Sequence, residues 1–162
     1  MFSNMTVRTD QVKVFMENPV FLSSITSWFL AQLLKAVIVL LRASRRSARD
    51  IALTLMWKTG GMPSSHSALV TALATSVGFT EGVGSTLFVV TLCLALIVIR
   101  DSLGVRRSSG LQARSLNILG RHVSERMDIE YHPVKEIQGH APLEVLVGSL
   151  LGLFIASAYA LL

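Results

Sequence analysis

The sequence predicts an all-α integral membrane protein, a helical bundle with about four to five membrane helices and a cytoplasmic amphipathic segment. Hydrophobic residues make up 51% of the 162 residues and charged residues only 15%, whereas a soluble domain carries about 25% charged residues. The apolar residues also gather into long runs, and a helix that crosses a bilayer needs about 20 of them in succession. The length suits a single domain.

The turn-forming and polar residues between the apolar runs predict the helix boundaries. Asn18-Pro19 separates a surface or interfacial segment, residues 1–18, from a membrane domain, residues 19–162, because proline suits the first turn of a helix. In that domain we expect apolar helices at 20–41, 64–78, 85–103 and 140–162. The 64–78 helix is short for a span, so we expect it to be tilted or to start inside the protein. Residues 104–139 form a polar cytoplasmic insertion that holds an amphipathic helix at 109–128.

The charge pattern predicts the orientation of the chain. The net charge is +5, and the segments 42–62 and 100–139 are basic, while the turn at 79–84 has no Lys or Arg. The positive-inside rule places both basic segments in the cytoplasm and both termini on the far side. These basic residues lie between apolar runs and aromatic residues are few, so we expect no binding of nucleic acid. We expect the single cysteine, Cys93, to pack inside the protein.

Lys35 and Arg42 are the first pair of residues suited to binding an anion. They are seven residues apart in the first apolar run, so they lie on the same face of a helix. An ionisable side chain inside a membrane helix is costly and therefore points to function. The alternative is that Arg42 anchors the helix at the cytoplasmic surface and Lys35 reaches toward water.

Pro63-Ser64-Ser65-His66 forms the second feature, at the start of a helix. Free backbone N–H groups at a helix start, together with two hydroxyls, suit an anion. A histidine in this position can donate a proton to a leaving oxygen. The alternative is an N-capping turn beside an incidental histidine.

His140 and Glu144 form the third feature, four residues apart at the start of the last apolar run. On one helix face, Glu144 can accept a proton from one ring nitrogen of His140 and leave the other nitrogen free to attack. The alternative is a purely structural pair. Arg100, Asp101, Arg106 and Arg107 follow the third apolar run, and arginine binds phosphate oxygens in a bidentate way. Cytoplasmic anchoring is the alternative for each arginine, and Asp101 can orient one of them.

The remaining histidines, His122 and His132, are interpreted as surface residues. No Asp, Glu, His or Cys cluster with the spacing of metal ligands surrounds His66 and His140. We therefore expect no metal and no other cofactor.

Together, Lys35-x6-Arg42, Pro63-Ser64-Ser65-His66 and His140-x3-Glu144 resemble the three signatures of the type 2 phosphatidic acid phosphatase superfamily, which includes bacterial acid phosphatases and vanadium haloperoxidases. The strings Gly-Gly-Met-Pro-Ser-Ser-His-Ser-Ala, Asp-Ser-Leu-Gly-Val-Arg-Arg and Gly-His-x-Pro-x-Glu-Val resemble its divergent bacterial and plant branch. The match covers residues 30–155.

The sequence departs from the superfamily pattern at four places. Ala43 replaces the proline after Arg42, Ser65 replaces a glycine, and Glu144 replaces an aspartate. The superfamily arginine has no counterpart six residues before His140, where Val134 stands. Arg106 or Arg107 is then the candidate for its role.

The resemblance implies a phosphatase for lipid phosphate monoesters that works without a metal. His140 would be the nucleophile, Glu144 its partner and His66 the general acid. Lys35, Arg42, Ser64, Ser65 and an arginine at 106 or 107, oriented by Asp101, would bind the phosphate. The alternatives are a non-catalytic membrane scaffold and a carrier or transporter of a phosphorylated lipid. We expect a bacterial cytoplasmic membrane, or a plastid membrane, with the active site on the cytoplasmic side and a homo-oligomer as one arrangement.

Overall fold

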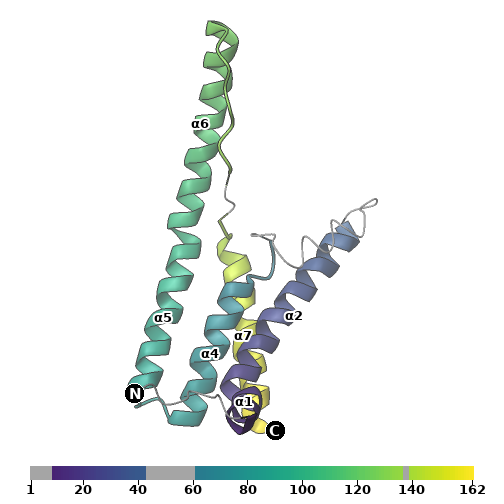
Figure 1. The fold of residues 1–162 in the computed structure, drawn as a ribbon, viewed down its shortest axis with the longest axis vertical. Coiled ribbons are helices and arrows are strands. Elements are labelled where there is room, and N and C mark those ends of the chain that lie inside the picture. Colours follow the sequence, from purple (N-terminus) through teal and green to yellow (C-terminus); the bar gives the residue numbers. More distant parts are fainter. Residues whose placement is uncertain (1–8, 43–60, 137–138) are drawn as a thin grey trace, which may run out of the picture.

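A computed structural model describes residues 9–42, 61–136 and 139–162, and every regular element in these ranges is an α-helix. The bundle consists of α2 (Pro19–Arg42), α4 (Ser65–Glu81), α5 (Thr86–Leu103) and α7 (Pro142–Leu161) (Figure 1). The short helix α1 (Thr9–Met16) lies at one end of the bundle, and α6 (Val105–Met127) extends from the other. The predicted all-α membrane bundle is confirmed.

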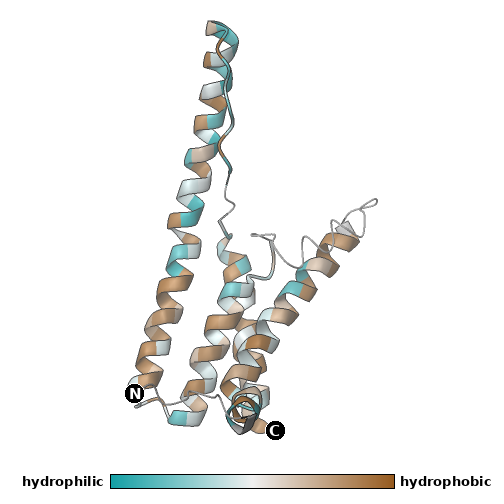
Figure 2. Ribbon diagram, in the orientation of Figure 1, coloured by the Kyte–Doolittle hydropathy of each residue, from teal (hydrophilic) through white to brown (hydrophobic). Residues whose placement is uncertain are grey.

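Three helical stretches are long and apolar enough to cross a membrane among the described residues. They are Pro19–Leu41, Thr86–Met127 and Pro142–Leu161. Figure 2 shows the hydrophobic colouring concentrated in the bundle, while α6 alternates between hydrophilic and hydrophobic residues. The helix α4 has only 17 residues and packs against α2, α5 and α7, so it is the central helix of the bundle.

Small residues bring α4 and α7 into close contact. A Cβ atom at Gly148 would collide with the carbonyl oxygen of Ser64, and one at Gly152 would collide with that of Ala68. The two glycines are four residues apart, so they lie one turn apart on the same face of α7. Their spacing in the sequence predicts close helix packing, and the structure confirms it. In a membrane, where apolar burial drives association weakly, such backbone proximity is a main source of helix contact.

The predicted helix boundaries shift at two places near the polar insertion. The amphipathic helix begins at Val105 rather than 109, because the hydrogen bonds Gly104 N–H to Arg100 O and Ser108 N–H to Gly104 O, both 2.9 Å, carry the helix through Gly104. The last helix begins at Pro142 rather than 140, since proline occupies its first turn and Ala141 is the N-cap. Cys93, expected inside, is exposed on α5.

The loops sort to two ends of the bundle. The ends of α2 and α5 and the starts of α4 and α7 lie at one end, and α1, the α4–α5 turn and the end of α7 lie at the other (Figure 1). This arrangement agrees with the grouping that the charge pattern predicts. The basic residues Arg45, Arg46, Arg49 and Lys58 lie outside the described residues.

Candidate active site

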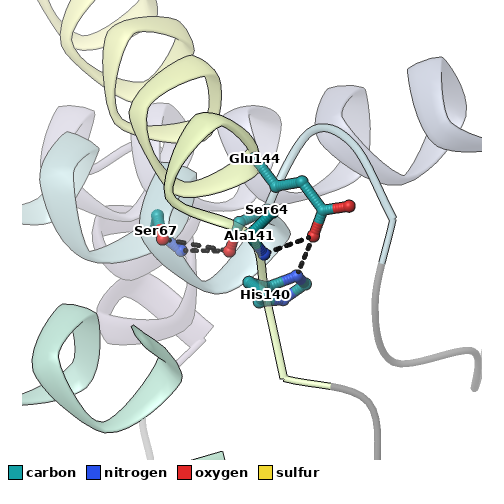
Figure 3. A network of polar contacts seen from close by, with 5 residues as sticks. All are labelled: Ser64, Ser67, His140, Ala141 and Glu144. Carbon is teal, nitrogen blue, oxygen red and sulfur yellow. Dashed lines mark hydrogen bonds and ion pairs between the residues drawn. The ribbon is translucent and has the colours of Figure 1, made fainter. Parts of the chain in front are cut away.

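His140 and Glu144 are in direct contact at the start of α7. The Nδ1 atom of His140 lies 3.0 Å from Oε2 of Glu144, and the same oxygen accepts the backbone N–H of Ala141 at 3.2 Å (Figure 3). The side chain of His140 is only 8% exposed and that of Glu144 is 22% exposed. His140 lies two residues before the helix. A bend in the chain therefore brings its ring to Glu144, and the two residues do not share a helix face as predicted. With Nδ1 bound to a carboxylate, the ring has a fixed orientation and Nε2 is its second nitrogen.

The start of α4 is held by Ser64. Its Oγ accepts the backbone N–H of Ser67 at 3.3 Å and the hydroxyl of Ser67 at 3.0 Å. Ser64 and Ser67 are fully buried, so these hydrogen bonds are shielded from water. Ser64 is therefore the N-cap that fixes the first turn, in which Ser65, also buried, and His66 follow.

A backbone hydrogen bond links this turn to α7. Ser64 donates its N–H to the carbonyl oxygen of Glu144 over 2.9 Å, and Gly148 lies against the same serine one turn later. The predicted role of Ser64 as an N–H ligand for an anion therefore needs correction, because this N–H already has an acceptor. At the helix start, Ser65 and His66 retain the N–H groups that have no acceptor inside the helix.

Lys35 lies beneath this turn. The residue is 3% exposed, and a Cβ atom at Gly61 would lie 3.8 Å from its Cγ and Cδ atoms. Glu144 is near enough for its charge to act on Lys35. Within the described parts of the chain, no carboxylate forms an ion pair with its ammonium group. A buried cation of this kind favours an anion as its partner.

His66 lies within the electrostatic reach of the other candidate residues. Although the residue keeps an exposed surface, partial burial of its ring lowers its pKa below the ordinary value of 6.5. The positive charges of Arg106, His140 and Lys35 lower the pKa of His66 further, in that order. The negative charge of Asp101 raises the pKa of His66. The two histidines and the buried lysine therefore belong to one electrostatic cluster.

Arg106 is oriented by Asp101. Its Nε atom lies 2.7 Å from Oδ2 of Asp101, across the junction between α5 and α6. Arg107 takes a different position, because its backbone packs against Gly139, where a Cβ atom would collide with it. This contact holds the first turn of α6 beside the residue that precedes His140.

The remaining predictions divide between the surface and residues outside the description. Arg42 ends α2 at the same end of the bundle as the cluster, but its side chain lies outside the described residues. His122 and His132 are exposed, as predicted. In the described ranges, no group of three or more His, Cys, Asp or Glu residues could hold a metal ion.

Two further residues of the site, Ser67 and Gly139, are not among the residues that the sequence predicts for it. Ser67 completes the cap at Ser64, and Gly139 permits the approach of Arg107. Each of them stands next to a candidate catalytic histidine in the sequence, Ser67 after His66 and Gly139 before His140. A side chain that caps its neighbour and a glycine that admits a distant backbone are, however, not visible as spacing.

Comparison with known proteins supports the resemblance. The model of the divergent PAP2 family matches residues 16–155. The chain belongs to this family. Among relatives in the divergent PAP2 family, the uncharacterized membrane protein YuiD of Bacillus subtilis (strain 168) is 38% identical over 150 residues, which cover 86% of this chain and 92% of that protein. No solved structure matches the chain.

The match to the divergent PAP2 family includes every described residue of the candidate active site. The matched residues include Lys35, His66, Asp101, Arg106 and the His140–Glu144 pair. Together with the membrane-protein relative and the candidate spans, this identifies an integral membrane protein related to the PAP2 proteins.

Proposed function

We propose that this protein is a membrane phosphatase that hydrolyses a lipid phosphate monoester through a phosphohistidine intermediate. The observation that carries the proposal is the contact between His140 Nδ1 and Glu144 Oε2, 3.0 Å apart, beside His66 and the buried Lys35. A histidine paired with a carboxylate can act as a nucleophile, and a second histidine can supply the acid.

The cations of the cluster suit the phosphate group. In the proposed complex, Lys35 and Arg106 bind the non-bridging oxygens, and the N–H groups of Ser65 and His66 bind at the start of α4. These groups stabilise most strongly the charge on the equatorial oxygens in the transition state. Arg42 is proposed to join them from the end of α2.

The first step transfers the phosphoryl group. Nε2 of His140 attacks phosphorus, the bond from phosphorus to the ester oxygen breaks, and His66 donates a proton to the leaving alkoxide. Glu144 stabilises the positive charge that develops on His140. The first product is the lipid alcohol.

The second step releases inorganic phosphate. His66, now neutral, takes a proton from water, whose oxygen attacks the phosphohistidine. The phosphorus–nitrogen bond breaks, and the electron pair returns to His140. Both histidines regain their starting states, so the cycle balances without a metal or other cofactor.

The position of the cluster suits an amphipathic substrate. It lies at the end of the bundle where α2 and α5 leave the apolar region (Figure 1). A lipid there can keep its acyl or prenyl chain in the bilayer while its phosphate reaches the cations. The basic loops on this side favour the cytoplasmic face of a bacterial membrane.

Phosphate release by the purified protein in lipid–detergent micelles tests the proposal, with a panel of diacylglycerol, glycerol-linked and polyprenyl phosphates. Turnover lost in His140→Ala and retained in His122→Ala supports the enzyme, because His122 is an exposed histidine on α6. Acid-labile radiolabel from a labelled lipid phosphate should be trapped on the unaltered protein by rapid quenching and be absent from His140→Ala. If the protein binds lipid phosphates but hydrolyses none of the panel, the scaffold or carrier is favoured instead.

A further inference from the structure

An apolar stripe runs along α6 outside the bundle. Leu116, Leu119, Val123 and Met127 recur every three to four residues, so they lie on one side of the helix. Leu116 is 50% exposed, Leu119 60% and Met127 67%. An open groove of about 540 Å³ lies along this stripe, and its lining residues are the apolar Leu119, Val123 and Met127 and the polar His122, Glu125 and Arg126.

We expect this stripe to lie outside the membrane. The helix continues from α5 into α6 as one stretch of 42 residues, and α6 points away from the bundle (Figure 1). At a rise of 1.5 Å per residue, Leu116 is about 18 Å beyond Gly104. The hydrogen bonds across Gly104 hold this direction, so the stripe faces water unless a protein covers it.

Three arginines of α6 lie away from the stripe. Arg107, Arg114 and Arg121 are seven residues apart, so they form a line of their own along the helix. Arg121 lies two residues after Leu119, about 200° around the helix. A partner that meets the apolar stripe therefore does not meet this basic line, even if the partner carries the same charges.

The two flanks of the stripe differ in charge. On one flank lies the 128–136 strap, the extended segment that runs back along α6 (Figure 1). The strap is held to α6 by hydrogen bonds from Ser124 Oγ to Ile129 O and between the side chain of Asn117 and the backbone of Val134. The strap begins with Asp128 and Glu130, which are exposed. On the other flank lies Arg126, about 60° from Val123 in the opposite sense.

We propose that the stripe binds the same stripe of a second copy, with the two α6 helices parallel. Copies inserted in one membrane share their orientation, so a two-fold axis along the membrane normal relates neighbours. That axis places the Arg126 flank of each copy against the strap flank of its neighbour. Arg126 then meets Asp128 and Glu130 at the same height, and both ends of the symmetric contact are complementary in charge.

The same line continues into the membrane. Leu94, Val105, Leu116 and Met127 are spaced by eleven residues, which is close to three turns of helix. Leu94 is 44% exposed and Val105 is 65% exposed. The contact between copies therefore runs along both α5 and α6, which gives it the length that a few α6 side chains alone lack.

Cysteine cross-linking of the full chain in lipid bilayers tests this arrangement. In a Cys93→Ser background, Val123→Cys should form a disulfide-linked dimer on oxidation, because Val123 lies midway between the two flanks, where a two-fold axis brings identical residues together. Arg121→Cys, at nearly the same height on the opposite face, should form no disulfide-linked dimer. Absence of a disulfide-linked dimer at 123, or equal amounts at both positions, would overturn the proposal.

A charge exchange tests the parallel register. Arg126→Glu should lower the cross-linking yield of Val123→Cys about fivefold, the combined effect of two partly exposed ion pairs. Adding Glu130→Arg should restore the yield. If the double variant cross-links no better than Arg126→Glu alone, the proposed facing of these residues is wrong. Elution of every reduced variant as a single symmetric peak, at equal yield, checks that each one folds.

Discussion

Ser64 donates its backbone N–H to the carbonyl oxygen of Glu144 over 2.9 Å. This hydrogen bond joins the turn that carries His66 to the turn that carries His140, although the two histidines are far apart along the chain. Gly148, one turn further along α7, packs on the carbonyl of the same serine. The alignment of the two imidazoles therefore depends on the contact between α4 and α7.

Gly148→Ala is expected to disturb this alignment. The added methyl group meets the backbone oxygen of Ser64, which has no rotamer to adopt, so α4 and α7 must separate. Overpacking of this kind costs about 1–3 kcal/mol. Thermal unfolding in detergent should show the loss, and phosphate release should fall with it.

Gly84→Ala is the matched control, because nothing lies within 4 Å of a Cβ atom at Gly84. That variant should keep both stability and activity. If Gly148→Ala matches it in both measurements, the close contact does not position the site.

Glu144→Gln is expected to slow turnover by about 10²–10⁴-fold. The amide keeps the size of the side chain but removes the charge that stabilises a positive His140 ring. Glu144→Asp keeps the charge on a shorter chain, so its loss should be smaller. Rates of phosphate release at saturating substrate measure both effects.

Glu81→Gln, an exposed carboxylate at the end of α4 away from the cluster, controls for a general effect of charge. Equal rates for Glu144→Gln and the unaltered protein would leave the carboxylate without a role in the chemistry.

The pKa of His66 is expected to respond to its charged neighbours. In the free protein this pKa lies below 6.5, first because of burial and then because of Arg106, His140 and Lys35. Arg106→Gln should therefore raise it and Asp101→Asn should lower it. A bound phosphate dianion should also raise it, which makes His66 an acid in the substrate complex. Histidine NMR titration with and without inorganic phosphate measures these changes.

The same shift has a consequence for stability. Because the pKa of His66 is lower in the folded protein than in the unfolded chain, the unfolded state binds the proton more readily. The contribution of His66 to stability is therefore lost as the pH falls from above 6.5 through its lower folded pKa. A His66 signal that ignores phosphate and the Arg106 substitution would contradict its place beside the anion.

The sequence predicts which residues of this site lie together better than it predicts how they meet. The interval between His140 and Glu144 identified a pair that is in contact, but the reason was wrong, since His140 precedes the helix and the chain bends at Ala141. The membrane bundle could be predicted because each membrane helix is a continuous apolar run, which is visible in the sequence without knowledge of the tertiary contacts. Ser64 was assigned to the anion because a helix start has free N–H groups, and only its contact with α7 reveals that this N–H is already used.

The two arginines show the same limit. The sequence offers Arg106 and Arg107 equally, because both lie in the segment expected between the helices at 85–103 and 109–128. The helix instead continues through Gly104, which fixes the rotation of both side chains. Arg106 then pairs with Asp101, while Arg107 packs its backbone on Gly139. A glycine that keeps a helix intact looks identical in sequence to one that ends it.

This difference yields a prediction about which arginine binds phosphate. Arg106→Ala should raise KM for the lipid phosphate about tenfold or more, since a charge-assisted hydrogen bond to a charged group contributes about 1.5–3 kcal/mol. Arg107→Ala should change KM little, because its backbone, which the substitution retains, makes its contact with Gly139. Arg106→Lys should recover only part of the affinity, as an ammonium cannot hold Asp101 and phosphate with one planar group. Kinetics over a range of lipid phosphate concentrations, at fixed detergent, separate KM from kcat. A larger effect at Arg107 than at Arg106 would mean that the ion pair with Asp101 holds Arg106 away from the substrate rather than toward it.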